Sequence, residues 1–393
     1  MRKIELPSDV RFIISRLASF GHRADVVGGS VRDALLMRPV GDYDLTTSAL
    51  PEEVRAAFPE FKTVDTGIRH GTLTVIINKV PYEITTYRTD GEYLDNRHPT
   101  SVTFTDSLAL DLSRRDFTVN AMCYNESFGL TDLFDGERDL SLGVIRAVGE
   151  PEVRFTEDAL RILRALRFAS VLGFSVEERT AAAVRELYPR LKSVSVERIF
   201  TEWQKLIAGD GAYSVLRDFG EPLGEMILGI PNILLPAEAA FNAATPALRT
   251  YSLYALNFEN PAEAFSASMH RLKSPARTRT HGEAVLRAFS GEIPVSDFDI
   301  LLALGEYGED VLLDAARLWI MLGRADASLR EKILGVSSSG IPYKISALKI
   351  NGGDLIARGI SGERVGAELR RVLLAVMRGE CEPTREAELS LLD

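Results

Sequence analysis

Residues 24–45, ADVVGGSVRDALLMRPVGDYDL, decide the fold of this chain. The apolar run 24–27 predicts a short buried strand that ends at the Gly28–Gly29 pair, because glycine pairs mark turns between regular elements. Neither glycine carries a Cβ, so a bulky anion can approach the backbone closely. Ser30 then opens a predicted helix whose free N–H groups and positive dipole end face the turn. The stretch therefore predicts a strand–turn–helix unit that seats a phosphate.

A pair of carboxylates follows this unit, in the segment Gly41–Asp42–Tyr43–Asp44–Leu45. On a strand, Asp42 and Asp44 project to the same face, about 7 Å apart along the backbone. An Asp-x-Asp segment by itself is more often a solvated turn. Two carboxylates on one face beside a phosphate seat, however, are what a divalent-metal site for phosphoryl transfer needs. We therefore predict that Asp42 and Asp44 are metal ligands and catalytic residues.

The composition is that of a globular protein and excludes several classes. The 393 residues are 46% hydrophobic and 26% charged, a length that suits about two to four domains. No apolar run is long enough to span a bilayer, so we expect no membrane segment and a cytoplasmic protein. Two cysteines and five scattered histidines argue against a disulfide framework and a zinc site. The net charge of −10 argues against a protein that coats nucleic acid everywhere, but it allows a local basic groove.

Periodicity predicts a mixed α/β region followed by helices. Helices are expected over 8–20, 51–58, 112–124 and 155–169, a β-hairpin over 71–87, and two helices over 176–208 with a break near Pro189. Ser8 and Thr156 are the expected N-caps of the helices that they open. From 209 onward only helical periodicity with Gly and Pro punctuation remains. The fold class is therefore α+β.

Glu83 and Arg32 are further candidate site residues, and each has two interpretations. A lone Glu on a strand usually faces water, but Glu83 on the second strand of the hairpin would complete a two-metal site beside the Asp pair. The guanidinium of Arg32 suits a triphosphate, because it presents a fork of donors. The alternative for Arg32 is a structural ion pair with Asp33.

The segment 155–169, FTEDALRILRALRFA, carries the second charged constellation. On a continuous helix Asp158, Arg161 and Arg164 share one broad face, whereas Arg167 drifts around it. Salt bridges on a solvated helix are the simpler interpretation. Residues 154–205 nevertheless hold ten Arg and Lys against seven Asp and Glu, a local excess of positive charge that suits an anionic substrate.

The combination of GGSVRD at 28–33 with GDYDL at 41–45 resembles the signature of the DNA polymerase β-type nucleotidyltransferases. More narrowly, it is similar to the class that includes bacterial class II tRNA CCA-adding enzymes and poly(A) polymerases. The resemblance covers the whole chain in order, with specific motifs in the first 170 residues. It implies a catalytic nucleotidyltransferase head (1–150) followed by three helical parts. These are a base-recognising neck (151–208), a body (209–325) and a tRNA-binding tail (326–393).

The same resemblance implies roles for individual residues. Arg115 and Asp116 match the RRDFT-x-NA motif, whose Arg contacts the nucleotide and whose Asp helps to recognise the ribose. Asp158 and Arg161 match the motif that recognises the base: an Asp accepts from an exocyclic amine and an Arg donates to ring acceptors, so the pair favours C and A over U and G. The remaining residues that the resemblance assigns to the nucleotide are Gly29, Ser30, Arg32, Arg164 and Arg167, and Glu83 takes the place of its third carboxylate.

Two further segments resemble CCA-adding members of the class. TGIRHGTLTV at 66–75 is similar to their sequence, whereas the poly(A) polymerases tend to carry a glycine-rich basic stretch there. Residues 88–103, RTDGEYLDNRHPTSVT, resemble the flexible loop that CCA-adding enzymes use when specificity switches from C to A. A surface insertion is the alternative for this second segment.

The implied reaction is template-independent addition of C, C and A to the 3′ end of tRNA from CTP and ATP, with Mg²⁺ as cofactor and release of pyrophosphate. An A-adding tRNA enzyme and a poly(A) polymerase share every catalytic motif. A non-catalytic RNA-binding relative is the alternative from another class, but such a protein should have lost one of its Asp pair. The sequence sets no oligomeric state.

Overall fold

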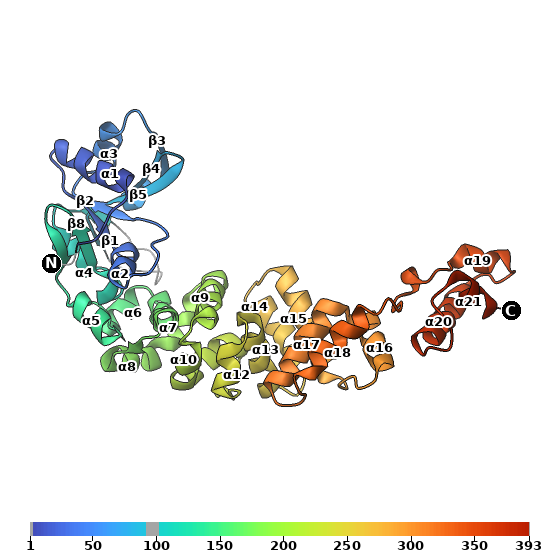
Figure 1. Cartoon of the computed structure of the whole chain (residues 1–393). Helices are drawn as coiled ribbons and strands as arrows, with labels where there is room; N and C mark the ends of the chain where they lie inside the picture. Colours follow the sequence, from blue (N-terminus) through green and yellow to red (C-terminus); the bar gives the residue numbers. More distant parts are fainter. Residues whose placement is uncertain (1–2, 92–101, 393) are drawn as a thin grey trace. The chain divides into compact units, whose positions relative to one another are not determined.

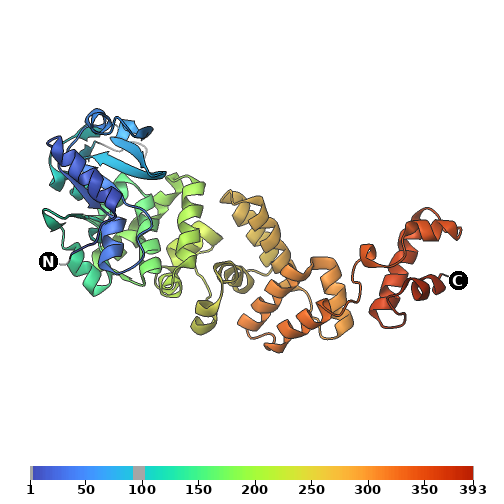
Figure 2. The same cartoon turned by 45° about the horizontal axis from the view of Figure 1, so that its top comes forward.

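The computed structural model describes residues 3–91 and 102–392, which fold into two compact units, Met1–Met226 and Ile227–Asp393. The described strands all lie in the first unit, together with the predicted site. The second unit, coloured from yellow to red in Figure 2, is built from helices. This agrees with the predicted α+β class. The finer division at 150, 208 and 325 stays a prediction.

A seven-stranded mixed sheet forms the centre of the first unit, in the order β3-β4-β5-β2-β1-β8-β9 (Figure 1). β1 pairs antiparallel with β2 on one side and with β8 on the other, and β2 pairs parallel with β5. The strands are β1 (Ala24–Val27), β2 (Leu45–Thr47), β3 (Lys62–Gly67), β4 (Thr72–Ile77), β5 (Val80–Thr86), β8 (Met122–Asn125) and β9 (Gly129–Asp132). All four residues of β1 are buried, so both faces of the sheet are covered at this central strand.

Helices surround this sheet and continue the first unit beyond it. They are α1 (Ser8–Ser19), α2 (Gly29–Leu35), α3 (Pro51–Ala57), α4 (Leu108–Ser113), α5 (Gly136–Leu142), α6 (Pro151–Glu157), α7 (Leu160–Leu172), α8 (Glu178–Leu187), α9 (Val196–Ala208), α10 (Ala212–Asp218) and α11 (Gly220–Leu223). The two short strands β10 (Val144–Ile145) and β11 (Ser175–Val176) pair in parallel. α1 buries Val10, Ile13 and Leu17 at helical spacing, which is why this segment folds as an amphipathic helix.

The second unit packs helices around buried aromatic and aliphatic side chains. Trp319 is 1% exposed, and its indole N–H donates to the carbonyl of Phe289 at 2.9 Å. The helices are α12 (Glu238–Ala243), α13 (Pro246–Asn257), α14 (Pro261–Arg271), α15 (Ala276–Ser290), α16 (Asp297–Tyr307), α17 (Glu309–Met321), α18 (Ser328–Ser337), α19 (Gly352–Ala357), α20 (Glu363–Met377) and α21 (Arg385–Ser390). In the part of the chain that the structure describes, none of the helices has the length and apolar character needed to cross a membrane.

Most predicted elements are confirmed. The strand and helix that flank Gly28 are β1 and α2, and the hairpin over 71–87 is β4 and β5. Asn78 and Lys79 form its turn with positive φ angles of 51° and 68°, the handedness that two-residue hairpin turns require. α8 and α9 are separated near Pro189, as predicted.

Two predicted helices are wrong in their extent. The segment 112–124 holds only the end of α4, after which Phe117 adopts an extended backbone and bridges Ala147. β8 then takes over because its edge pairs with β1. The helix over 155–169 is interrupted at Asp158, whose φ of −133° and ψ of 104° end α6.

The predicted caps and the acidic strand also need correction. Pro7 occupies the N-cap of α1 instead of Ser8, and Thr156 lies inside α6 instead of opening a helix. Asp42 and Asp44 precede β2 instead of lying on it. The physical reason is that β1 turns away at Gly28, so its last residue meets this segment through the Val27 N–H, which donates to the Asp44 carbonyl at 3.0 Å.

The predicted loop over 88–103 begins and ends in strands. β6 (Arg88–Asp90) pairs antiparallel with β7 (Val102–Phe104). The central part of that prediction, residues 92–101, lies outside the described residues.

Candidate active site

The turn between β1 and α2 forms the first wall of the site. Gly28 has a φ of +79° and its N–H donates to the carbonyl of Met122 at 3.1 Å. The hydroxyl of Ser30 donates to the carbonyl of Val27 at 3.2 Å and thereby closes the turn. A Cβ on Gly28 would lie 3.2 Å from Nη1 of Arg115, so glycine is needed both for the backbone angle and for the space. α2 spans only seven residues, so the glycine turn and the arginines beside it carry the candidate phosphate seat.

The predicted carboxylates lie near one another: Asp42 and Asp44 directly precede β2, and Glu83 lies on β5. Leu45 pairs with Ile84 across β2 and β5, and both are buried, so the preceding residues Asp44 and Glu83 are neighbours on the opposite, exposed face. Asp44 lies on the exposed face, but desolvation by the surrounding protein raises its pKa to about 6. The negative charges of Asp42 and Glu83 add to this increase, and the positive charge of Arg115 opposes it. The three carboxylates therefore repel one another, and a bound cation would relieve this repulsion.

This donor set fits a divalent cation by its chemistry. Carboxylate oxygens are the ligands that hard divalent cations prefer, and Asp42, Asp44 and Glu83 are all exposed. Over residues 3–91 and 102–392, no three acidic, histidine or cysteine side chains are already gathered closely enough to hold a metal ion. Metal binding here therefore requires the carboxylate side chains to converge.

Arg115 connects the carboxylates to the glycine turn. Its guanidinium approaches Gly28 at Nη1, interacts electrostatically with Asp44, and donates through Nη2 to Oδ2 of Asp111 at 3.4 Å. Its Nε is buried and has no hydrogen-bond partner among the described residues. Nη1, which faces the turn, is the donor available to an anion that occupies it.

Asp116 is held by a strong ion pair. Nε and Nη2 of Arg164 donate to Oδ2 of Asp116 at 2.8 and 2.5 Å, and Nδ2 of Asn120 donates to Oδ1 at 3.2 Å. Burial alone would raise the pKa of Asp116, but Arg164, Arg161 and Asn120 outweigh it and lower the pKa to about 2. Asp116 is therefore ionised and acts only as an acceptor at neutral pH.

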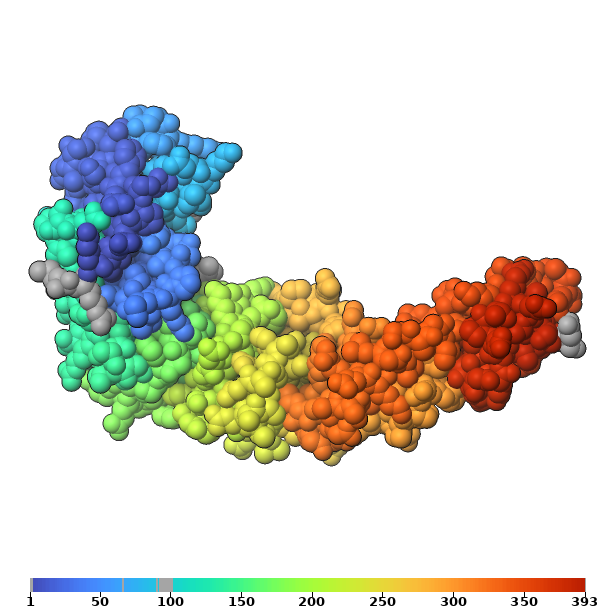
Figure 3. All heavy atoms as spheres, in the orientation of Figure 1, coloured from blue at the N-terminus to red at the C-terminus, as the bar shows by residue number. Residues whose placement is uncertain are grey.

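A polar pocket of about 280 Å³ gathers the predicted ribose- and base-reading residues. Asp158 and Arg161 both line this pocket. Asp158 lies between α6 and α7, and its carboxylate accepts from the N–H of Leu160 at 3.0 Å, at the start of α7. The pocket is lined by Arg114, Arg115, Asp116, Asp158, Leu160, Arg161, Arg164 and Arg198. In Figure 3 the blue surface of the sheet region meets the green surface of the helices that follow it.

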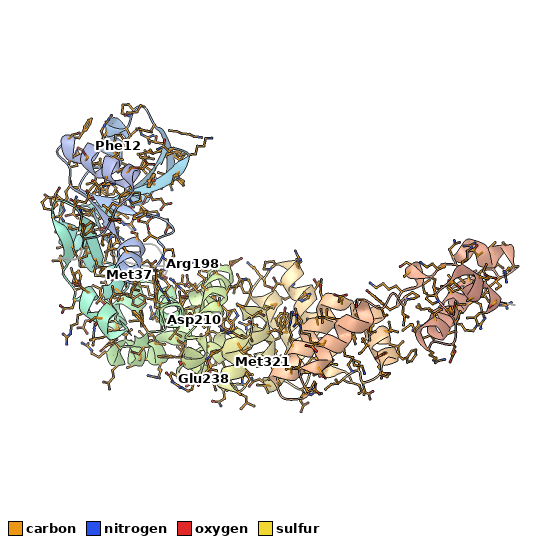
Figure 4. All side chains as sticks on the ribbon, viewed as in Figure 1. Phe12, Met37, Arg198, Asp210, Glu238 and Met321 are labelled. Atoms are coloured by element: carbon orange, nitrogen blue, oxygen red, sulfur yellow. The ribbon has the colours of Figure 1, made fainter. Side chains whose placement is uncertain are left out.

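The pocket residues already have partners in the chain. Nη1 of Arg161 donates to Glu157 at 2.8 Å and its Nη2 donates to the carbonyl of Arg114 at 3.0 Å. Arg198, labelled in Figure 4, comes from α9 and pairs with Asp158 at 3.1 Å. A nucleotide base that bonds to Asp158 and Arg161 must therefore replace or extend these contacts.

Arg32 and Arg167 both contact the ring of Phe168, and each pairs with a different carboxylate. The guanidinium of Arg32 pairs with Asp33 at 2.9 Å, donates to Oδ1 of Asn120 at 2.6 Å and lies 5.1 Å from the ring centroid of Phe168. The structural ion pair considered as the alternative for Arg32 is therefore formed. Arg167 lies 3.5 Å from the same centroid and pairs with Glu202 at 2.8 Å, outside the lining of the pocket.

Sequence reasoning missed Asp111 and Arg198. Asp111 precedes Arg114 and Arg115 by three and four residues, a spacing at which helical side chains meet, so this signal was present in the sequence. Arg198 lies 40 residues from Asp158, and no local pattern connects them.

The strand–turn–helix unit, the carboxylates at β2 and β5 and the basic pocket define a nucleotidyltransferase. Residues 24–146 match the family model of the poly(A) polymerase head domain, and residues 173–220 match that of the probable RNA- and SrmB-binding site of polymerase A. The chain belongs to the CCA-adding enzymes. It is 38% identical over 388 residues to the CCA-adding enzyme of Lactobacillus delbrueckii subsp. bulgaricus, an alignment that covers 95% of this chain and 94% of that one.

Other relatives agree with this assignment. The CCA-adding enzyme of Streptococcus pneumoniae is 37% identical over 416 residues, with 98% of each chain covered. The crystal structure of the Bacillus stearothermophilus CCA-adding enzyme in complex with CTP superposes with a TM-score of 0.76 at 34% identity, over 98% of this chain and 95% of that one. The Thermotoga maritima CCA-adding enzyme complexed with tRNA matches with a TM-score of 0.68 at 19% identity, over 98% and 95% of the two chains, which shows a shared fold.

Proposed function

We propose that this protein adds C, C and A to the 3′ end of tRNA, using CTP and ATP and releasing pyrophosphate. Its membership of the CCA-adding family supports this reaction. The structural observation that carries the proposal is the position of Arg115, which joins the exposed carboxylates, the glycine turn and the basic pocket. One nucleoside triphosphate can therefore reach all three with its reacting phosphate near the carboxylates.

Asp42 and Asp44, with Glu83, are the proposed ligands of Mg²⁺. Two bound Mg²⁺ ions would lower the pKa of the attacking 3′-hydroxyl of tRNA and stabilise the leaving pyrophosphate. The parallel pairing of β2 with β5 supports Glu83 as the third carboxylate, because it makes Glu83 a neighbour of Asp44.

The triphosphate is proposed to bind at the turn. Gly29 presents backbone without a side chain, the hydroxyl of Ser30 is bonded to the carbonyl of Val27, and Nη1 of Arg115 faces Gly28. Arg32 lies beside Gly29, since a Cβ there would be 3.5 Å from its Nη2. To contact a phosphate, Arg32 must exchange part of its bonding to Asp33 and Asn120.

The pocket is proposed to select ribose and base. Asp116 is an ionised acceptor for a ribose hydroxyl and so favours NTP over dNTP. Asp158 accepts from the amine that C and A share, and Arg161 donates to the adjacent ring acceptors, so the protein replaces a nucleic-acid template. Arg164 positions Asp116 through its ion pair, whereas a nucleotide contact by Arg167 stays a prediction that the observed pairing with Glu202 does not support.

The proposed partner is the 3′ end of tRNA, and we place the reaction in the cytoplasm. In the proposed tRNA-binding tail, α20 carries Arg364, Arg370 and Arg371, and Arg371 pairs with Glu368 at 2.7 Å.

A gel assay tests this function. Three tRNA transcripts that end at the discriminator base, at C and at CC are incubated with Mg²⁺ and labelled CTP and ATP together, and in parallel with each labelled NTP alone. Additions that stop at CCA on all three are the expected result. Addition of A alone to the third transcript would instead indicate an A-adding enzyme, long A tails would indicate a poly(A) polymerase, and tRNA binding without incorporation would indicate a non-catalytic relative.

A further inference from the structure

A fully buried carboxylate, that of Asp111 on α4, lies between the parts of the candidate site. Its side chain is 0% exposed. Oδ1 accepts from Nε and Nη2 of Arg114 at 3.0 and 2.7 Å and from the N–H of Arg88 at 3.4 Å. Oδ2 accepts from the hydroxyl of Thr46 at 3.0 Å and from Nη2 of Arg115 at 3.4 Å. A carboxylate with this many donors is fixed in one orientation.

Each of these partners belongs to a different part of the site. Thr46 lies on β2, two residues after Asp44. Arg115 reaches from Asp111 to Gly28, and the carbonyl of Arg114 accepts from Arg161 at 3.0 Å. Asp111 thus contacts Thr46 on β2, the guanidinium of Arg115 beside the glycine turn, and Arg114, whose carbonyl holds Arg161.

We propose that Asp111 is a positioning residue for nucleotidyl transfer, which holds the guanidinium of Arg115 over the Gly28–Gly29 turn for the triphosphate of CTP or ATP. The inference rests on the proposed function. Asp111 is too deeply buried to touch a nucleotide, so it acts through Arg115. Since Nη2 of Arg115 is bound to Asp111, the turn-facing Nη1 is the donor presented to the phosphates.

A purely structural role, the neutralisation of two neighbouring arginines, would affect stability and leave nucleotide affinity unchanged. Asp25 provides a matched control because its side chain is also 0% exposed. Its carboxylate accepts from Nε and Nη2 of Arg23 at 2.8 and 2.9 Å and from the hydroxyl of Tyr87 at 3.1 Å. None of these partners lines the pocket. Asp111→Asn and Asp25→Asn thus remove the same buried charge at two different places.

The experiment measures Tm and the affinity for CTP of the full chain in the presence of Mg²⁺. Both variants are expected to lower the Tm, but only Asp111→Asn should weaken CTP binding, by about tenfold or more, because a charged hydrogen bond to phosphate contributes that much. Competition by cytidine, which has no phosphate, should change less than twofold. Equal weakening of CTP binding in both variants, or unchanged binding in folded Asp111→Asn, would overturn the inference.

A double variant tests whether Asp111 acts through Arg115. Asp111→Asn combined with Arg115→Gln should bind CTP no more weakly than Arg115→Gln alone, whereas additive losses would refute the route through Arg115. If Asp111→Asn does not fold, Thr46→Val removes one bond to Oδ2 and keeps the charge. We expect it to weaken CTP binding about threefold, and unaltered binding would count against the inference. If the wild-type protein binds no CTP, the proposed function is overturned as well. If the wild type binds CTP and the variants do not behave as expected, only the role of Asp111 is refuted.

Discussion

Replacement of Gly28 by alanine disturbs both the backbone of the glycine turn and the guanidinium beside it. Gly28 has a φ of +79° and a ψ of −129°, where a side chain costs about 1–3 kcal/mol. The added Cβ would also lie 3.2 Å from Nη1 of Arg115. Because the backbone of the turn is held by the bond from Gly28 to Met122, Arg115 is the group that must move.

Two magnitudes follow from this geometry. Backbone strain lowers the free energy of unfolding by about 1–3 kcal/mol, which for a unit of this size lowers the Tm by about 2–4 °C per kcal/mol. Displacement of Arg115 removes a charged hydrogen bond to the triphosphate, worth about 1.5–3 kcal/mol. The KM for CTP should therefore rise by about 10- to 150-fold.

Gly21→Ala supplies the matched control. Gly21 has a φ of +88°, but a Cβ there would meet no atom within 4 Å. It lies before the start of β1, whereas Gly28 follows its end. Thermal unfolding and CTP incorporation into a tRNA transcript should show similar losses of Tm in the two variants and a raised KM in Gly28→Ala alone. An unchanged KM in Gly28→Ala, or an equal rise in both variants, would refute the reasoning.

Three further predictions concern the carboxylates and the pocket. Asp42→Ala or Asp44→Ala should abolish incorporation and leave tRNA binding intact, because proposed metal ligands are lost; incorporation and gel-shift assays on one sample measure both. Arg161→Ala should lower the preference for CTP and ATP over UTP and GTP about tenfold or more, as measured by competitive incorporation. The folded pKa of Asp116 is about 2 against an ordinary value of 3.8. Its contribution to stability is therefore complete above about pH 4 and is lost as the pH falls through 2, so the Tm of the wild type should fall more steeply across this window than that of Asp116→Asn.

Different outcomes would contradict these three predictions. Turnover that persists in either Asp variant removes that residue from the metal site. An unchanged nucleotide preference in folded Arg161→Ala removes it from base selection. Parallel Tm curves between pH 4 and pH 2 would mean that the ion pair of Asp116 with Arg164 does not govern this part of the acid sensitivity.

Local pattern was sufficient for the elements that depend on neighbouring residues. Apolar periodicity and the Gly28–Gly29 pair predicted β1 and α2, and β-branched residues around a two-residue turn predicted β4 and β5. These forecasts succeeded because the hydrogen bonds of a turn, a helix or a hairpin close over a few residues. The combination of GGSVRD at 28–33 with GDYDL at 41–45 also predicted the family without any tertiary contact.

Only the tertiary structure decided where elements stop and which partner each charge takes. Asp42 and Asp44 leave the strand because β1, the neighbour of β2, turns away at Gly28. The break at Asp158 depends on its carboxylate, which accepts from Leu160 and pairs with Arg198 on another helix.

The chain alone determined which chemical groups the site contains, because residue types and short spacings are local properties. It did not determine that Arg167 turns to Glu202 or that Asp111 holds Arg115. Such choices among several available partners depend on which side chains packing brings within hydrogen-bond distance and on the cost of burying a charge without one.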